Sequence, residues 1–214
     1  MQFPPSYIKF PAVESANEDG LLAVGGDLSP GTLVNAYRHG IFPWYNEGEP
    51  ILWWSPNPRF VLFPGKIKVS KSMRALLNKD KFRFTVNKAF PEVIKACKTA
   101  PRKDQQGTWI SPAVQEAYIR LHEMGYAHSA EAWQDEKLAG GLYGVRLGNV
   151  FFGESMFSNE SNASKFAFIK YIAQLETEHV ALIDCQVYTP HLESLGAEMI
   201  ERKTFISLLN KLIP

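Results

Sequence analysis

The chain after residue 66 alternates between two spacings of apolar side chains, one typical of helices and one typical of strands. Helical spacing follows the cap residues Ser70, Asn87 and Ser111, and it returns from about residue 162 to 176. The clearest stripe, at i, i+3, i+4 and i+7, is formed by Phe90, Val93, Ile94 and Cys97. A short helix after Thr189-Pro190 and a final helix at 205–212 complete the helices that these patterns predict.

Alternating or continuous apolar runs predict strands between these helices. Three of them, at 127–133, 138–145 and 150–154, are joined by turns short enough for an antiparallel meander. Other strands are expected at 82–86, at 180–187 and near Met199. Helices, a meander, a helix and a further strand follow one another in the order of a GNAT-like (acyl-CoA N-acyltransferase-like) domain. We therefore predict an α+β fold with a mixed sheet.

The first 64 residues differ from the rest in holding nine of the 14 prolines and three of the five tryptophans. Proline at this density prevents long regular elements, so this part should be compact and rich in loops. One helix is expected here, opening at Ser29-Pro30 and ending at Gly40, with Leu33, Ala36 and Tyr37 on its apolar stripe. We predict two domains, a small N-terminal one at 1–64 and a GNAT-like catalytic one at 65–214.

Composition places the chain among globular proteins, since 45% of its residues are hydrophobic and 21% are charged. No apolar run approaches the roughly 20 residues that cross a bilayer. The first residues have neither the basic nor the apolar region of a secretory signal. Its two cysteines, Cys97 and Cys185, are too few for a disulfide framework and are expected in the core. These features indicate a cytoplasmic protein without a membrane anchor.

The formal net charge of +1 conceals a basic segment at 66–103, which has twelve Lys or Arg and two acidic residues. Such a segment on a nearly neutral chain indicates a polyanion-binding surface, because each phosphate that it neutralises releases counterions. A solvated helical surface is the alternative interpretation. The residues that we assign to nucleic-acid binding are Lys66, Lys68, Lys71, Arg74, Lys79, Lys81 and Arg83.

Asp184 is the most informative single residue, because it stands in the otherwise apolar strand 180–187. A buried carboxylate needs a partner, a ligand or a cleft. Strand alternation places Gln186 on the same face, and Glu154 at the end of its own strand should lie on a neighbouring strand. Two carboxylates at one cleft suit acid–base chemistry or the binding of an amine. The alternative is an aspartate that only braces a loop.

Motifs for metals and nucleotides are missing from the sequence. The five histidines have no ligand-like spacing, and there is no C-x-x-C pair. Neither the G-x-x-x-x-G-K-[ST] loop nor G-x-G-x-x-G occurs. The sequence therefore predicts no metal and no cofactor.

Eight motifs in order resemble the leucyl/phenylalanyl-tRNA–protein transferase family and span nearly the whole chain. They include Trp53-Trp-Ser-Pro-Asn-Pro-Arg59, Gly153-Glu-Ser-Met-Phe-Ser158 and Ile183-Asp-Cys-Gln186. The resemblance implies a small domain packed on a GNAT-like domain, and transfer of Leu or Phe, and less well Met, from aminoacyl-tRNA. The acceptors would be proteins that begin with Arg or Lys, which the added residue marks for degradation in the N-end rule pathway. A monomer without a membrane partner is expected.

The resemblance also implies the site residues. Trp44, Trp109 and Tyr118 match residues that border the aminoacyl-adenosine, and we assign Phe151 and Ser155 to the same site. Glu154 and Asp184 would lie at its centre, with Gln186 assisting Asp184. Asp184 could accept the proton of the attacking amine or only position Gln186, whereas Glu154 would attract the cationic acceptor or the donor's free amine.

Two rival functions remain open at this stage. One is an N-acetyltransferase that uses acetyl-CoA, although the Q/R-x-x-G-x-G/A loop expected for its pyrophosphate is missing. The other is a non-catalytic RNA-binding module built on the basic segment, which would gain nothing from carboxylates in a cleft.

Overall fold

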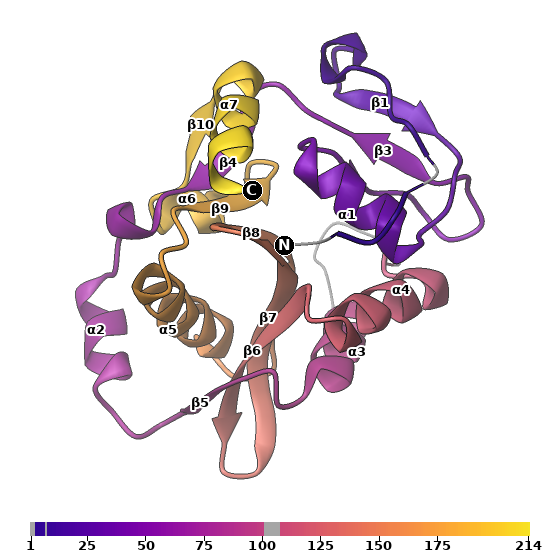
Figure 1. The fold of residues 1–214 in the computed structure, drawn as a ribbon. Coiled ribbons are helices and arrows are strands. Elements are labelled where there is room, and N and C mark those ends of the chain that lie inside the picture. The colour runs from indigo at the N-terminus through magenta and orange to yellow at the C-terminus, as the bar shows by residue number, and fades with distance from the viewer. Residues whose placement is uncertain (1–2, 7, 101–107) are drawn as a thin grey trace.

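The computed structural model describes residues 3–6, 8–100 and 108–214. A seven-stranded sheet forms its centre, in the order β10-β4-β9-β8-β7-β6-β5 (Figure 1). Only β8 and β9 run parallel among these described strands, and the other neighbours are antiparallel. The strands are β4 (Arg59–Leu62), β5 (Arg83–Val86), β6 (Ala127–Gln134), β7 (Lys137–Leu147), β8 (Val150–Ser158), β9 (Leu182–Gln186) and β10 (Glu198–Ile200).

Helices cover both faces of this sheet (Figure 1). The helices fall into two groups according to the apolar cluster in which they are buried. One cluster contains α5 and the buried residue of α2, and the other contains residues of α1, α3, α4 and α7. The helices are α1 (Pro30–Arg38), α2 (Lys71–Leu77), α3 (Phe90–Thr99), α4 (Pro112–Glu123), α5 (Ala163–Thr177), α6 (Pro190–Ser194) and α7 (Arg202–Leu212). The predicted α+β class, its mixed sheet and the GNAT-like order of elements are confirmed.

The predicted helix starts are confirmed where serine stands at the cap. The side chains of Ser29, Ser70 and Ser111 each accept a hydrogen bond from a backbone N–H of the first turn. Asn87 was wrong as a cap: α3 begins at Phe90 after Ala89, and Asn87 has a left-handed φ of 58°. Its side-chain oxygen instead accepts a hydrogen bond from the backbone N–H of Ser129, which links the segment before α3 to β6.

The first 64 residues contribute to both sheets. A small sheet in the order β1-β3-β2 is formed by β1 (Leu21–Val24), β2 (Phe42–Pro43) and β3 (Leu52–Trp54). The next strand, β4, instead pairs with β9 and β10 of the large sheet. The division of the chain at residue 64 stays a prediction.

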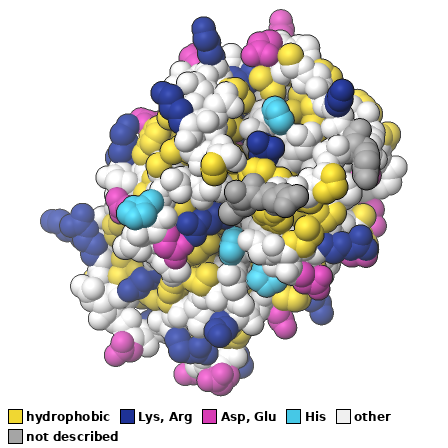
Figure 2. All heavy atoms as spheres, in the orientation of Figure 1, with side chains coloured by type: hydrophobic (Ala, Val, Ile, Leu, Met, Phe, Trp, Pro, Cys, Tyr) yellow, Lys and Arg dark blue, Asp and Glu magenta, His cyan; other side chains and the backbone are white. Residues whose placement is uncertain are grey.

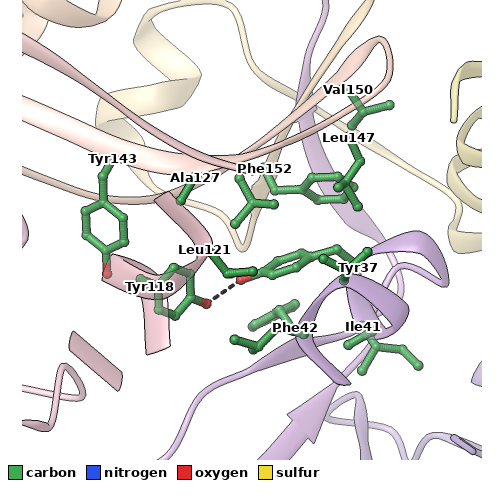
Figure 3. Packing of buried hydrophobic residues seen from close by; sticks show 14 of the residues in the cluster. Tyr37, Ile41, Phe42, Tyr118, Leu121, Ala127, Tyr143, Leu147, Val150 and Phe152 are labelled. Atoms are coloured by element: carbon green, nitrogen blue, oxygen red, sulfur yellow. Dashed lines mark hydrogen bonds between the residues drawn. The ribbon is translucent and has the colours of Figure 1, made fainter. Parts of the chain in front are cut away.

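Tyr37 of α1 lies at the contact between the N-terminal part and the large sheet. It is fully buried, and its ring packs on Phe152 of β8 with 5.0 Å between the ring centroids. Figure 3 shows it between Phe152 on one side and Phe42 on the other, with its hydroxyl directed at Tyr118 of α4. The same contact places the hydroxyl of Tyr37 in the interior, where it donates to Glu154 at the candidate functional site.

Candidate functional site

A cavity of about 380 Å³ opens where β8 and β9 stop pairing. The parallel ladder runs from Val150 and Leu182 to Phe152 and Asp184, where its register ends. Around that point both strands line the cavity with consecutive residues, 153–156 from β8 and 183–186 from β9, and Val187 after β9 continues the lining. A regular strand would direct only every second side chain at the cavity. The two strand ends therefore depart from regular strand alternation here. Apolar side chains such as Leu142, Phe168 and Leu192 dominate its other walls.

Glu154 enters this cavity from a β-bulge. Gly153 of β8 is opposite Gly144 and Ser155 is opposite Tyr143, so Glu154 has no partner in β7. Such a bulge re-aims a side chain, as is common beside active sites. The carboxyl of Glu154 is reached by three donors from three elements: Tyr37 Oη at 2.7 Å, Tyr118 Oη at 3.0 Å and Gln186 Nε2 at 3.0 Å.

The surroundings of Glu154 favour its neutral form. Its pKa is raised to about 8, chiefly by burial and also by the charge of Asp184, although the hydrogen bonds from Tyr37, Tyr118 and Gln186 oppose this rise. Burial also raises the pKa of both tyrosines, with a further contribution from Glu154, so their hydroxyls keep their hydrogens. At neutral pH the carboxyl is therefore mostly protonated.

A count of hydrogens supports the same protonation state. The hydroxyls of Tyr37 and Tyr118 contact each other as well as Glu154 (Figure 3). Three contacts need three hydrogens, but two hydroxyls supply only two. Because both hydroxyls donate to Glu154, their contact with each other has no hydrogen of its own unless the carboxyl carries a proton. The geometry therefore fits a neutral carboxyl better than a charged one.

Asp184 has a partner that the sequence interpretation did not identify. Arg59 of β4 binds it through both carboxylate oxygens, at 2.8 Å from Nε and 2.7 Å from Nη2. Both side chains have at most 1% exposure, and the guanidinium lies 4.7 Å from the ring centres of Phe42 and Phe205. The need for a partner that the apolar strand implied is thus met within the protein.

Gln186 lies next to Asp184 and Glu154, as predicted, but its contacts differ from those expected. Its backbone N–H donates to Asp184 at 2.9 Å, whereas its side chain donates to Glu154. Its φ of 64° is left-handed, and the pairing of β9 with β4 shifts register here, leaving Cys185 without an opposite residue. Simple alternation along this strand was therefore wrong at its end. Cys185, expected in the core, is only partly buried and lines the cavity, whereas Cys97 is buried.

The predicted aromatic and substrate-binding residues separate into two groups. Trp44, Trp109 and Ser155 line the cavity, and Trp44 is 39% exposed. Tyr118 stands behind the cavity wall and holds Glu154. Phe151 has no exposed surface and packs on Tyr171 of α5, with 5.2 Å between ring centroids, so the structure places it in the core and not at the cavity.

The predicted nucleic-acid residues are all at least partly exposed and lie around α2 and the strand that follows it. Figure 2 shows Lys and Arg side chains projecting from the edge of the molecule where Figure 1 places α2. Two of these residues also form exposed ion pairs: Lys66 with Glu198 at 2.6 Å and Arg83 with Glu136 at 3.9 Å. Arg102 and Lys103, which belong to the same basic segment, lie outside the described residues.

Neither a metal-binding cluster nor a membrane span is found in the described part of the chain. No group of three or more His, Cys, Asp or Glu there is placed to hold a metal ion. Across the same residues, no helix has both the length and the apolar character that a membrane span requires.

Sequence reasoning missed Tyr37 and Arg59 as site residues. Tyr37 was assigned to the apolar stripe of α1, and only its hydroxyl sets it apart from a core residue. Arg59 begins an apolar strand, Arg59–Leu62, that is buried at every position. A charged residue on such a strand needs a partner, as Asp184 does, and the two needs could have been matched.

Comparisons with known proteins give a consistent family. The model of the leucyl/phenylalanyl-tRNA protein transferase family matches residues 61–210, and the model of its N-terminal domain matches residues 26–57. The leucyl/phenylalanyl-tRNA–protein transferase of Syntrophus aciditrophicus is 61% identical over 95% of this chain and 85% of that protein. Its counterpart in Christiangramia forsetii is 59% identical over 94% of this chain and 96% of that protein.

Solved structures resemble the chain more distantly. The structure of L-PGS from Bacillus licheniformis has a TM-score of 0.41 and 10% identity, covering 72% of this chain and 51% of that one. A GCN5-related N-acetyltransferase from Kribbella flavida has a TM-score of 0.36 and 13% identity, covering 79% and 60%.

Proposed function

Because the chain belongs to the leucyl/phenylalanyl-tRNA–protein transferase family, we propose that it transfers Leu or Phe, and less well Met, from aminoacyl-tRNA to proteins that begin with Arg or Lys. The acceptor is the α-amino group, and the product is marked for degradation in the N-end rule pathway. The observation that carries this proposal is an apolar cavity with Glu154, held by three donors, at its wall. We assign the activity to a cytoplasmic monomer.

The cavity suits an uncharged aminoacyl side chain. Its volume of about 380 Å³ lies in the range of small-ligand pockets, and its walls are mainly apolar. A pocket that selects by shape discriminates weakly between side chains that differ by a methylene, which explains leakage to Met. Trp44 and Trp109 at the same cavity offer aromatic faces for the terminal adenosine, and such stacks contribute roughly 1–3 kcal/mol each.

The main contribution that this reaction requires from the protein is to position the amine and the ester. Aminolysis of an activated ester is downhill, and the attacking α-amino group has a pKa of roughly 7.7–8.0, so part of it is already neutral. Holding the amine and the ester in attack geometry can supply roughly 7–11 kcal/mol. No ATP, metal or CoA enters this scheme.

The contacts of Asp184 support positioning over proton transfer. One oxygen accepts from Arg59 and from the N–H of Gln186, the other accepts from Arg59, and the side chain has no exposed surface. An attacking amine would need to displace one of these bonds to reach it. Glu154 has the more accessible carboxyl: in its neutral form it can donate a hydrogen bond to an amine, and only after losing that proton can it accept one from the amine.

The exposed basic residues around α2 supply the tRNA surface in this proposal. Their charge would bind phosphates without reading sequence, while the cavity holds the acylated end.

A transfer assay tests the proposed function. Leu-tRNA labelled in the aminoacyl group is mixed with a peptide that begins with Arg, and the label should appear on the peptide. Asp-tRNA is the control donor, because an apolar cavity should exclude a charged side chain. Label transfer from acetyl-CoA without transfer from Leu-tRNA would establish the N-acetyltransferase alternative. Binding of tRNA without transfer from Leu-tRNA or from acetyl-CoA would support the alternative of a non-catalytic RNA-binding module.

A further inference from the structure

We propose that Arg59 is a positioning residue of the transfer reaction, acting on Gln186 through Asp184. This inference rests on the proposed function and adds a residue to it. A chain of contacts leads from Arg59 inside the sheet to the carboxyl of Glu154 at the cavity. Each link in that chain has a distinct geometric basis.

The first link is the ion pair, which stability alone does not explain. The guanidinium and the carboxylate are both removed from water, which costs each of them its hydration. Nη1 of Arg59 is buried without a hydrogen-bond partner among the described residues. A buried ion pair with an unpaired donor is weak evidence for stabilisation, since apolar residues of similar volume often serve as well. The pair is better explained by the group that it orients.

The second link fixes the backbone of Gln186. Oδ1 of Asp184 accepts from Nε of Arg59 at 2.8 Å and from the N–H of Gln186 at 2.9 Å. Gln186 has a φ of 64°, a conformation that residues other than glycine rarely adopt. A carboxylate held rigidly by the planar fork of an arginine can keep this N–H, and hence this conformation, in place.

The third link brings the amide of Gln186 to Glu154. From its present backbone conformation the side chain leaves the strand end toward the cavity, where Nε2 lies 3.0 Å from Oε1. β4 reaches Gln186 a second time, because Phe60, next to Arg59, is opposite it in the ladder. Phe42, whose ring faces the guanidinium, also lines the cavity. Besides its ion pair with Asp184, Arg59 is thus linked to the site through its neighbour Phe60 and through Phe42.

Arg59→Lys tests the proposal, because lysine keeps the charge and loses the planar fork. We expect the folded variant to lose about 10²-fold in kcat, as a misplaced group does, with KM for both substrates nearly unchanged. Its pH–rate profile should shift upward, because the bond from Gln186 lowers the pKa of Glu154. Arg146→Lys is the matched control: it alters an ion pair with Glu178 that is partly exposed and lies outside the cavity lining, and it should leave kcat and the profile unchanged.

A double-mutant cycle identifies the route of the effect. If Arg59 acts through Gln186, then Arg59→Lys should lower kcat no further in a Gln186→Leu background. Additive losses, or a folded Arg59→Lys protein with the parent kcat and pH profile, would overturn the proposal. Should Arg59→Lys not fold, Arg59→Met with Asp184→Leu replaces the pair by apolar residues, and a folded double variant with the parent rate would overturn it equally.

Failure of the proposed function can be distinguished from failure of this inference. The parent protein is assayed first, and absence of transfer contradicts the function alone. A crystal structure of Arg59→Lys then judges the inference without activity. We expect Gln186 to leave the left-handed conformation and its amide to leave Glu154, and an unchanged Gln186 would contradict the role of Arg59.

Discussion

At the scale of single residues, the protonation of Glu154 is the property with the widest consequences. Three donors surround a carboxyl whose pKa is raised to about 8 by burial. The free protein therefore holds a neutral acid where the sequence alone suggested a negative charge that attracts cations. The acceptor's ammonium group would find a charged Glu154 only after this proton has left, so proton loss and acceptor binding should be coupled.

Glu154→Gln should make folding stability less dependent on pH. A carboxyl with a raised folded pKa contributes stability fully below its unfolded pKa, near 4.5, and loses it as the pH rises through about 8. Glutamine keeps the shape of the side chain, and its amide can still hydrogen-bond the hydroxyls of Tyr37 and Tyr118. The variant should be more stable than the parent by on the order of 3 kcal/mol near pH 9, after allowance for partial exposure.

Urea unfolding of both proteins at several pH values measures this difference. The two stabilities should converge toward about pH 4.5, the unfolded pKa of the carboxyl. Parallel curves across the whole range would mean that Glu154 is charged in the folded protein.

Asp184→Asn should be strongly destabilising, because it leaves Arg59 as a buried charge without its counter-ion. The expected loss is about 3–5 kcal/mol in the free energy of unfolding. Lys66→Met is the matched control, since it breaks the exposed pair with Glu198 and should cost about 0–1 kcal/mol. Chemical denaturation measures both, and equal losses would contradict the account of a buried, tightly bound pair. The activity of Asp184→Asn should be normalised to its folded fraction.

At the scale of elements, two bulges shape the site, one in β8 at Glu154 and one where β9 pairs with β4. The predicted helices, the meander and the neighbouring positions of Glu154 and Asp184 were accessible from the sequence because apolar spacing reports which face is buried. The bulges were not, because a bulge changes the register by one residue without changing the composition of the strand. Spacing does not pair Arg59 with Asp184 either, because they lie 125 residues apart, and only the need of each buried charge for a partner could have linked them.

Two glycines that are opposite each other at the β8 bulge should respond differently to alanine. A Cβ at Gly144 would lie 2.2 Å from the backbone oxygen of Phe152. A Cβ at Gly153 would have the backbone oxygen of Asp184 as its nearest neighbour, at 3.6 Å. Gly144→Ala should therefore lower stability by about 2 kcal/mol or more, as overpacking against backbone does. Gly153→Ala should stay close to the parent. Thermal unfolding of the two variants side by side checks this, and an equal effect would mean that the strands shift freely at the bulge.

At the scale of the whole molecule, the charge is divided between an exposed basic surface and a cavity with few charged groups. The basic residues around α2 carry the polyanion affinity in our proposal, and the cavity carries selectivity. These two functions can be changed separately, because none of the basic residues assigned to tRNA lines the cavity.

Neutralising Lys66, Lys68, Lys79 and Lys81 should weaken tRNA binding and reduce its dependence on salt. The slope of log K against log[salt] should fall by about one unit for each phosphate that the protein no longer neutralises. Filter binding over a range of salt concentrations measures both quantities. The control neutralises four exposed lysines outside the basic segment, namely Lys137, Lys170, Lys203 and Lys211. If both sets weaken binding alike, net charge and not the α2 surface is responsible.

The position of β4 between β9 and β10 affects how the protein forms on the ribosome. Arg59 is synthesised 125 residues before Asp184, which at about 5–20 residues per second is an interval of roughly 6–25 seconds. During that time β4 has neither of its neighbours in the large sheet, and the arginine has no counter-ion. The candidate site is therefore assembled only after β9 has been translated and has returned to pair with β4.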